Sequence, residues 1–429
     1  MTALTGCSPM PELLDAPRPA GWESLRQAAE RALEAQRFPT LKDEAWKYTD
    51  LKTLRETTFT PVPSASVDIR EHILPEAKGT RLVFVNGRFD AHSSNVSALP
   101  AGVRLLNLAS ASEAAKELGA LATPEASDVF ANLNTARFLD GAYLFVPKGV
   151  RVESPVHVLF LGSAQQDKTT ACALSRLLVV LEKGAEAHLV EEHAGHGAFL
   201  NNAVAEIHVH EGASLGHERI QRQPVESFHI GSLHARIERN ARYASRTVTL
   251  GAGISRQSPS VVLADEGAEL NLDGLALLNG SQIADTHSFI DHTKPNGVSR
   301  QLHKTIADDR SRAIFNGKIF VRPGAQATDA QQQSRNLLLS EQAQVDTKPE
   351  LEIFADDVKC AHGATVGQLD PEELFYLQSR GLNLTDAQNL LTYGFAADLI
   401  DRIPVPSLKR QLQQAVLDRT HSAGAGAKA

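Results

Sequence analysis

A short turn, in which Gly or Asn is followed by Ala, recurs through the middle of this sequence at an almost constant interval. The turns are Gly184-Ala185, Gly212-Ala213, Asn240-Ala241, Gly267-Ala268 and Gly324-Ala325. Their first positions differ by 28, 28, 27 and 57 residues, and Asn296-Gly297 falls near the midpoint of the longest gap. A period of about 28 residues that persists over six markers predicts a stack of similar structural units.

Each unit contains about two short strand-like runs, such as residues 176–181 and 203–209. One unit cannot bury its apolar face alone, whereas stacked units bury that face continuously. Gly or Asn at the corner tolerates the left-handed backbone of a sharp turn, and Ala beside it lets neighbouring coils approach. A β-sandwich with coincidental spacing is the alternative, but sandwiches rarely keep one period over six units. We therefore expect a mainly β fold, a solenoid over residues 126–365.

The N-terminal segment, residues 1–125, lacks this period. Apolar residues recur at helical spacing from Trp22 to Phe38, and residues 110–121 suggest a second helical stretch. Between them, residues 82–89 have the pattern of a strand, a turn and a returning strand. These patterns predict a mixed, partly helical domain before the solenoid.

The C-terminal segment, residues 366–429, is predicted to be helical. Asp370 is placed as an N-cap, Pro371 takes the first helical position, and Gly381 lies just past the end of this helix. Further helical patterns cover residues 384–402 and 407–419. The sequence thus predicts a β-solenoid between two helical terminal domains.

Composition excludes several classes of protein. The formal charge of −8 comes from interspersed charges of both signs, so the chain shows no basic arm for nucleic acid. Its three cysteines, Cys7, Cys172 and Cys360, are too widely spaced for a disulfide framework or a CxxC zinc site. The first twenty residues lack the pattern of a signal peptide, and no apolar run is long enough to span a membrane. We expect a cytoplasmic protein without a membrane partner.

Motifs of common enzymes are also missing. The sequence contains no GxxxxGK[ST] phosphate loop, no GxSxG and no HExxH. A β-helix enzyme that acts on polysaccharides is the alternative function for a solenoid. Such enzymes often hold sugars on many exposed aromatic rings, whereas aromatic residues make up only 5% of this chain.

Two segments near the C-terminus, DDVKCAHGATVG at 356–367 and EELFYLQSRG at 372–381, resemble the signature of the SufB/SufD family of iron–sulfur cluster assembly proteins. The segment EAWKYT at 44–49 is similar to the N-terminal motif of the same family. The resemblance therefore extends over all three regions. Chain length and the modest N-terminal part resemble the SufD branch more than the longer SufB branch.

The resemblance implies a right-handed parallel β-helix flanked by α-helical N- and C-terminal domains. It also implies a non-catalytic scaffold of the SufBCD complex of the SUF system, which pairs with SufB through the β-helix and binds the SufC ATPase through the C-terminal helices. No tightly bound cofactor is implied, although transient iron or a nascent iron–sulfur cluster is shared with SufB. Whether the isolated chain forms a homodimer is left open.

Cys360 and His362 are the candidate metal ligands. Residues two apart on an extended strand point to the same face, which suits shared ligation of iron by a thiolate and an imidazole. We expect Lys359 to lower the pKa of the thiol if it lies close. A complete cluster needs about four ligands, so a second chain would have to supply the others. The alternative is that Cys360 is a small core residue and His362 a satisfied turn residue.

The C-terminal helices carry the candidate ATPase-docking region. The resemblance places Phe375, Tyr376 and Arg380 in this region, while an end cap for the solenoid is the plainer reading of the same helices. Other histidine and acidic residues allow metal binding but are expected to face solvent from the strands. They are His188, Glu191, Glu192, His193, His196, His208, His210 and Glu211. Two acidic pairs, at 308–309 and 356–357, are expected to lie in turns.

Overall fold

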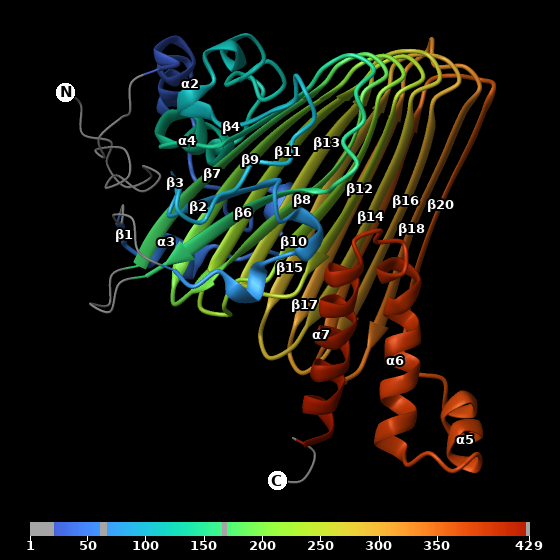
Figure 1. Ribbon diagram of the computed structural model, residues 1–429. Coiled ribbons are helices and arrows are strands. Elements are labelled where there is room, and N and C mark those ends of the chain that lie inside the picture. The colour runs from blue at the N-terminus through green and yellow to red at the C-terminus, as the bar shows by residue number, and fades with distance from the viewer. Residues whose placement is uncertain (1–20, 61–66, 165–169, 426–429) are drawn as a thin grey trace.

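The computed structural model describes residues 21–60, 67–164 and 170–425, and two facing β-sheets form its central body (Figure 1). Sheet A comprises β4 (Arg104–Asn107), β5 (Ala142–Val146), β7 (Thr170–Leu181), β9 (Phe199–Val209), β11 (Phe228–Ile237), β13 (Ile254–Leu263), β15 (Ile283–His292), β17 (Arg312–Val321) and β19 (Gln344–Ile353), with the short β1 (Phe59–Thr60) beside β7. Sheet B comprises β3 (Arg88–Phe89), β2 (Arg81–Val85), β6 (Val156–Ser163), β8 (Glu186–His196), β10 (Ser214–Gln221), β12 (Arg242–Thr249), β14 (Glu269–Leu278), β16 (Val298–Ala307), β18 (Thr328–Leu338) and β20 (Val358–Gly367). Because consecutive strands alternate between the sheets, every coil adds one strand to each, and the predicted parallel β-solenoid is confirmed.

The period of about 28 residues in the sequence equals the distance along the chain between residues that pair on neighbouring coils. Ser214 pairs with Glu186 on one side and with Arg242 on the other, each 28 residues away. The predicted left-handed corners have φ angles between 53° and 68° and lie at Gly184, Gly212, Asn240, Gly267 and Asn296. At the last predicted turn, Gly324-Ala325, the left-handed residue is instead Ala327, which has a φ angle of 56°.

Apolar side chains from both sheets meet in the interior of the solenoid. Fully buried examples include Leu177 and Ile207 from sheet A and Leu189 and Leu215 from sheet B, all in one continuous cluster. At about 25 cal/mol for each Å² of apolar surface removed from water, this cluster is a main source of stability for the coils.

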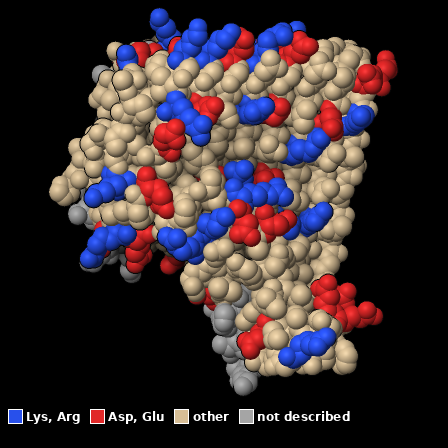
Figure 2. Space-filling model, turned by 45° about the vertical axis from the view of Figure 1, so that its right-hand side comes forward, with Lys and Arg blue, Asp and Glu red and all other residues tan. Residues whose placement is uncertain are grey.

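Charged side chains link one coil to the next at the edges of the stack. Lys183 and Glu211 approach within 2.8 Å, and Arg242 and Glu269 within 3.1 Å. Both pairs are solvent-exposed, so each contributes at most about 1 kcal/mol. Figure 2 shows positive and negative side chains lying close together over much of one face, with no extended patch of one sign.

The N-terminal part covers the outer face of sheet A with its helices. Two helices, α2 (Glu23–Ala35) and α4 (Val129–Arg137), pack together and against the first long strands of that sheet. Shorter elements complete this part: α3 (Lys52–Glu56) and the 3₁₀ turns η1 (Glu44–Trp46), η2 (Arg70–His72), η3 (Pro75–Ala77), η4 (Leu108–Ser110) and η5 (Ser112–Lys116). Of these, the turns η2 and η3 lie against the outer face of sheet B.

The helical stretch predicted over residues 110–121 is only partly confirmed, because residues 112–116 form the 3₁₀ helix η5 and the residues after it are not helical. The backbone N–H groups of Gly119, Leu121 and Ala122 instead donate to the carboxylate of Glu206 on β9. These hydrogen bonds to a buried charge replace the bonds that a longer helix would have made.

The C-terminal helices α5 (Pro371–Ser379), α6 (Leu384–Ile400) and α7 (Pro406–Ala425) agree with the predicted helical segments. The predicted N-cap is also confirmed, since Asp370 accepts a hydrogen bond of 2.8 Å from the backbone N–H of Glu372. Apolar residues of α6 and α7 pack against the outer face of sheet B. Figure 1 shows α5 projecting away from the sheets. Helices α6 and α7 therefore lie along the side of the solenoid, and its last coil is left uncovered.

No helix within the described ranges is both long and apolar enough to cross a lipid bilayer.

Candidate functional site

The last coil of the solenoid, β19 and β20, ends both sheets. Among the described strands, β20 pairs only with β18 and β19 only with β17. Every residue of β20 from Ala361 to Gly367 is exposed, whereas β9 in the middle of the stack is buried throughout. Each sheet therefore presents an open strand edge with unpaired backbone N–H and C=O groups, which can pair with a further strand.

Cys360 and His362 lie on this open strand. In the register of β18 and β20, Cys360 pairs with Ala330 and His362 with Gln332. Both partners are buried in the solenoid interior, so the two candidate ligands share the inward face, as the spacing predicts. Cys360 is half-buried against the apolar cluster, while His362 is exposed.

The environment of Cys360 does not activate its thiol. Burial, followed by the nearby Asp329 carboxylate, raises the pKa of Cys360, although a hydrogen bond with the backbone of Ala330 opposes this. The expectation that Lys359 lowers this pKa is wrong, because adjacent strand residues point to opposite faces. At neutral pH the unliganded cysteine is therefore a thiol rather than a thiolate.

A shallow hollow of about 320 Å³ surrounds His362. Its walls come from the paired strands β18 and β20 and include Gln331, Gln333, Arg335 and Thr365. Gly363 contributes no side chain to it, and an added Cβ there would meet no atom within 4 Å. The imidazole is thus accessible to a partner that approaches the open edge.

The part of the chain that the structure describes contains no group of three or more His, Cys, Asp or Glu side chains arranged to hold a metal ion. Cys360 and His362 offer one sulfur and one nitrogen donor, both of which suit iron. Cys7 lies outside the described residues. Two donors do not complete the set of about four that a cluster needs.

Exposed apolar residues near the open coil were missed by the sequence analysis. Ile353 is the last residue of β19 and is 39% exposed, Phe354 directly follows that strand and is 58% exposed, and Val366 on β20 is 48% exposed. Apolar residues in a strand are normally predicted to lie in the core, so no sequence signal distinguishes these three. Their exposure follows from the absence of a following coil among the described residues.

Of the candidate docking residues, Phe375 and Tyr376 lie on the projecting helix α5, and Arg380 is its C-cap. Phe375 is 73% exposed and Tyr376 is 55% exposed, and no residue of this helix is buried. The guanidinium of Arg380 lies 5.2 Å from the centre of the Tyr376 ring. Leu384 and Leu390 on α6 add exposed apolar surface at 49% each. Exposed apolar surface is often found where proteins contact one another.

Several histidine and acidic residues that were expected to face solvent are in fact buried. Glu191 and His193 lie inside the solenoid, where the carboxylate accepts a hydrogen bond of 2.7 Å from His193 Nε2. Glu192 faces the other side of β8 and contacts His72 and His157. His208 is covered by the N-terminal part, and Glu117 lies 3.7 Å from it. The expectation failed because β8 of sheet B and β9 of sheet A are each covered on both faces here.

Comparison with known proteins gives matches over nearly the whole chain. Residues 161–395 match the SufBD core domain of SUF system FeS cluster assembly, and residues 11–158 match the SufBD protein N-terminal region. An iron–sulfur cluster assembly SufBD family protein of Synechocystis is 40% identical over 92% of this chain and 90% of its own length. The iron–sulfur cluster assembly protein SufD of Escherichia coli is 34% identical, over 87% of this chain and 88% of its own length.

A plant relative extends this pattern. Protein ABCI7, chloroplastic, of Arabidopsis thaliana is 30% identical over 92% of this chain and 85% of its own length. These matches favour iron–sulfur assembly over the polysaccharide-acting enzyme considered above. The core-domain match includes the open coil and α5, and the N-terminal match includes the EAWKYT segment. The chain therefore belongs to the SufBD family of SUF-system iron–sulfur cluster assembly proteins.

Proposed function

We propose that this chain is a non-catalytic scaffold subunit that pairs with SufB through its open last coil and binds the SufC ATPase through α5 and the start of α6. The observation that carries the proposal is the open strand β20, which presents a His/Cys pair beside exposed apolar residues. A stable solenoid normally covers or blunts such an edge.

Strand addition is the mode of association that this edge supports. A partner strand beside β20 would satisfy the unpaired backbone groups and supply main-chain hydrogen bonds. The apolar side chains of Ile353, Phe354 and Val366 would then be removed from water at the same contact. A second SufBD-type solenoid, with an open coil of its own, fits this requirement.

Iron or a nascent cluster is proposed to bind transiently between the two subunits. Cys360 and His362 would provide two of its ligands, and the partner would provide the rest. Because the unliganded thiol is protonated at neutral pH, metal binding at Cys360 would release a proton. A site that is complete only in the assembly can release its cluster when the subunits move apart.

The test of this site uses the intact complex of the three proteins. Replacement of His362 by Ala is expected to lower the iron content and the yield of cluster, while assembly of the complex is retained. His92, an exposed histidine far from the open coil in the sequence, provides the matched control as His92→Ala. Unchanged iron content and cluster yield in the His362 variant would refute the ligand role.

The ATPase-docking proposal needs point substitutions rather than truncation. Removal of residues after 365 would uncover the outer face of sheet B, where Leu399, Leu408 and Leu412 are buried. Replacement of Phe375 and Tyr376 together by Ala leaves that core intact. We expect at least a tenfold loss of affinity for SufC, because exposed aromatic residues commonly dominate such contacts. Leu41→Ala, at a residue 48% exposed in the N-terminal part, is the control. Binding as tight as in the wild type would exclude α5 from the interface.

A further inference from the structure

Polar side chains follow one side of the solenoid interior from coil to coil. On sheet B they include Glu191, His217, Thr247, His303 and Gln332, and on sheet A they include Asn201, His229, Ser255 and Thr286. Such groups cost free energy in an interior unless each finds a hydrogen-bond partner. The hydrogen-bond partners of these side chains therefore show whether the solenoid interior must also hold water.

The hydrogen bonds around His229 fix its tautomer. Asn201 Oδ1 accepts from the Ser175 hydroxyl, so its amide nitrogen is the donor to His229 Nδ1 at 3.1 Å. The amide nitrogen of Gln223 also donates to His229 Nδ1 at 3.1 Å. Burial holds the pKa of His229 well below its ordinary value, so the ring is neutral. With Nδ1 accepting, the proton of the neutral ring is on Nε2.

This Nε2–H group and the side-chain oxygen of Gln257 both lie close to Gly231. Both atoms are buried, and neither has a hydrogen-bond partner within the described ranges of the chain. Gly231 lies between them: an added Cβ at this position would lie 2.8 Å from Gln257 Oε1 and 2.9 Å from His229 Nε2. A donor and an acceptor therefore converge beside a residue that has no side chain.

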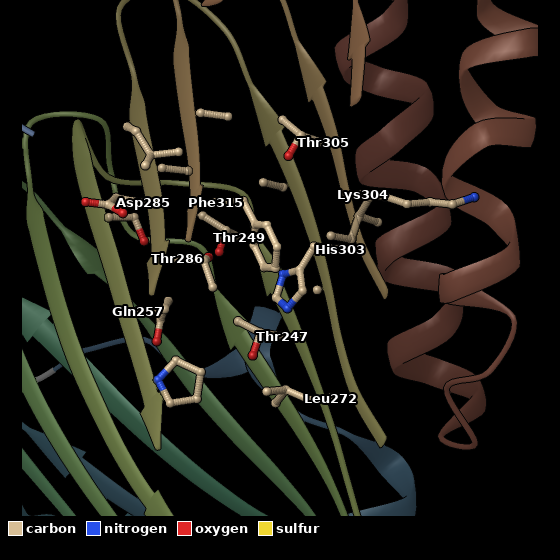
Figure 3. A pocket seen from close by; sticks show the side chains of 18 residues that line it. Thr247, Thr249, Gln257, Leu272, Asp285, Thr286, His303, Lys304, Thr305 and Phe315 are labelled. Carbon is tan, nitrogen blue, oxygen red and sulfur yellow. The ribbon is translucent and has the colours of Figure 1, made fainter. Parts of the chain in front are cut away.

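A cavity of about 30 Å³ continues from Gln257 between the two sheets. Figure 3 shows Thr247, Thr249 and His303 around this space, with Lys304 pointing away toward the C-terminal helices. Asp285, which also lines it, is neutralised on the outer face by Arg256 at 2.5 Å. The volume is enough for about two water molecules, each of which needs at least 10–15 Å³. The lining combines apolar side chains, among them Leu272 and Phe315, with hydroxyl, amide and neutral imidazole groups that can hydrogen-bond water.

We propose that an ordered water molecule beside Gly231 accepts a hydrogen bond from His229 Nε2–H and donates one to Gln257 Oε1. Water continues from there into the cavity, where the buried hydroxyl of Ser255 also has no partner among the described residues. This internal hydration site is independent of the proposed partner contacts.

The hydrated cavity joins two hydrogen-bonded clusters. On one side, Asn201 connects His229 to His193 and thus to Glu191. On the other side, Gln301 hydrogen-bonds both His303, at 3.1 Å, and Gln332, at 2.8 Å. Because Gln332 pairs with His362 in the register of the last two strands of sheet B, the polar interior reaches the open coil.

The first test is a high-resolution crystal structure of the full chain. We expect electron density for a water within hydrogen-bond distance of both His229 Nε2 and Gln257 Oε1. The absence of such density, or a direct contact between the two side chains, would overturn the proposal.

The second test measures the same site in solution, with ¹⁵N-labelled histidine in the full chain. We expect His229 to show the Nε2–H tautomer and a magnetisation-transfer peak from that proton to water. Gln257→Leu removes the acceptor and should abolish the peak, whereas Gln333→Leu, on the outward face of β18, should leave it unchanged. If Gln257→Leu does not fold, the wild-type spectrum still decides, since a protonated Nδ1 or no transfer to water would contradict the proposal.

Discussion

Thr49 donates a hydrogen bond of 2.5 Å to Asp285, although 236 residues separate them in the sequence. Asp285 also accepts from Arg256, whose guanidinium lies 3.9 Å from the centre of the Trp46 ring. Arg256 donates in addition to the backbone carbonyl of Ala45 at 2.8 Å. The EAWKYT segment is thus fixed to the outer face of sheet A, and its residue types are explained by these contacts.

Replacement of Trp46 by Ala should therefore destabilise the chain by about 3–5 kcal/mol, because it removes a buried ring and a desolvated cation–π contact. The measurement is the free energy of unfolding in urea. Arg256→Ala in the Trp46→Ala background should cost less than in the wild type, since the contact is already lost. Fully additive losses would show that the two side chains do not interact.

A second prediction concerns Arg176 and Glu206, whose side chains are completely buried and paired. Glu206→Ala would leave the arginine charge unpaired and three backbone N–H groups without their acceptor. We expect a loss of about 3–5 kcal/mol in the free energy of unfolding. Limited proteolysis should also show faster cleavage near residues 119–122, because the carboxylate holds this turn. Cleavage at the wild-type rate would contradict the anchoring role.

A third prediction follows from Glu218 on β10. Burial, with a smaller contribution from Asp273, raises the pKa of this carboxyl from 4.5 to about 7, although Arg246 at 2.7 Å opposes the shift. The folded protein therefore binds this proton more tightly than the unfolded chain does. The resulting stability is fully present below pH 4.5 and is lost as the pH rises through about 7.

Glu218→Gln keeps this position neutral at every pH. Relative to the wild type, its free energy of unfolding should rise by about 3 kcal/mol between pH 4.5 and about pH 8. Urea unfolding over this pH range provides the measurement, and Glu153→Gln at an exposed site controls for the lost carboxyl. A difference that does not change with pH would show that Glu218 is ionised throughout.

A fourth prediction concerns thiol reactivity, measured with Cys7 replaced by Ser. Cys172 is buried and should not react with a thiol reagent in the folded chain. Cys360 should react at neutral pH, but more slowly than a free cysteine, because it is half-buried and its pKa is raised. If the open coil pairs with SufB as proposed, adding SufB should slow the labelling of Cys360 at least tenfold. An unchanged rate in a stable complex would place that contact elsewhere.

The parts of the fold that could be predicted from the sequence are those that depend on residues close together in the chain. Gly184 or Asn240 at a corner permits a left-handed turn, and repetition of that turn sets the length of each coil. Helix α5 was predictable for a similar reason, since its N-cap Asp370 and the Gly381 after its end are signals in the adjacent sequence. The shared inward face of Cys360 and His362 also followed from strand geometry alone.

What the sequence did not determine is which surfaces are covered. Glu191 and Glu192 are adjacent, yet both are buried, because one points into the solenoid and the other lies beneath η2 and η3. Phe354 and Val366 have the residue types of a core but are exposed, because no described coil follows them. The period and the turns depend on neighbours in the chain, so the sequence determined the solenoid. Burial depends on packing between segments far apart in the chain, so only the tertiary structure decided which polar groups lie inside and which edge stays open.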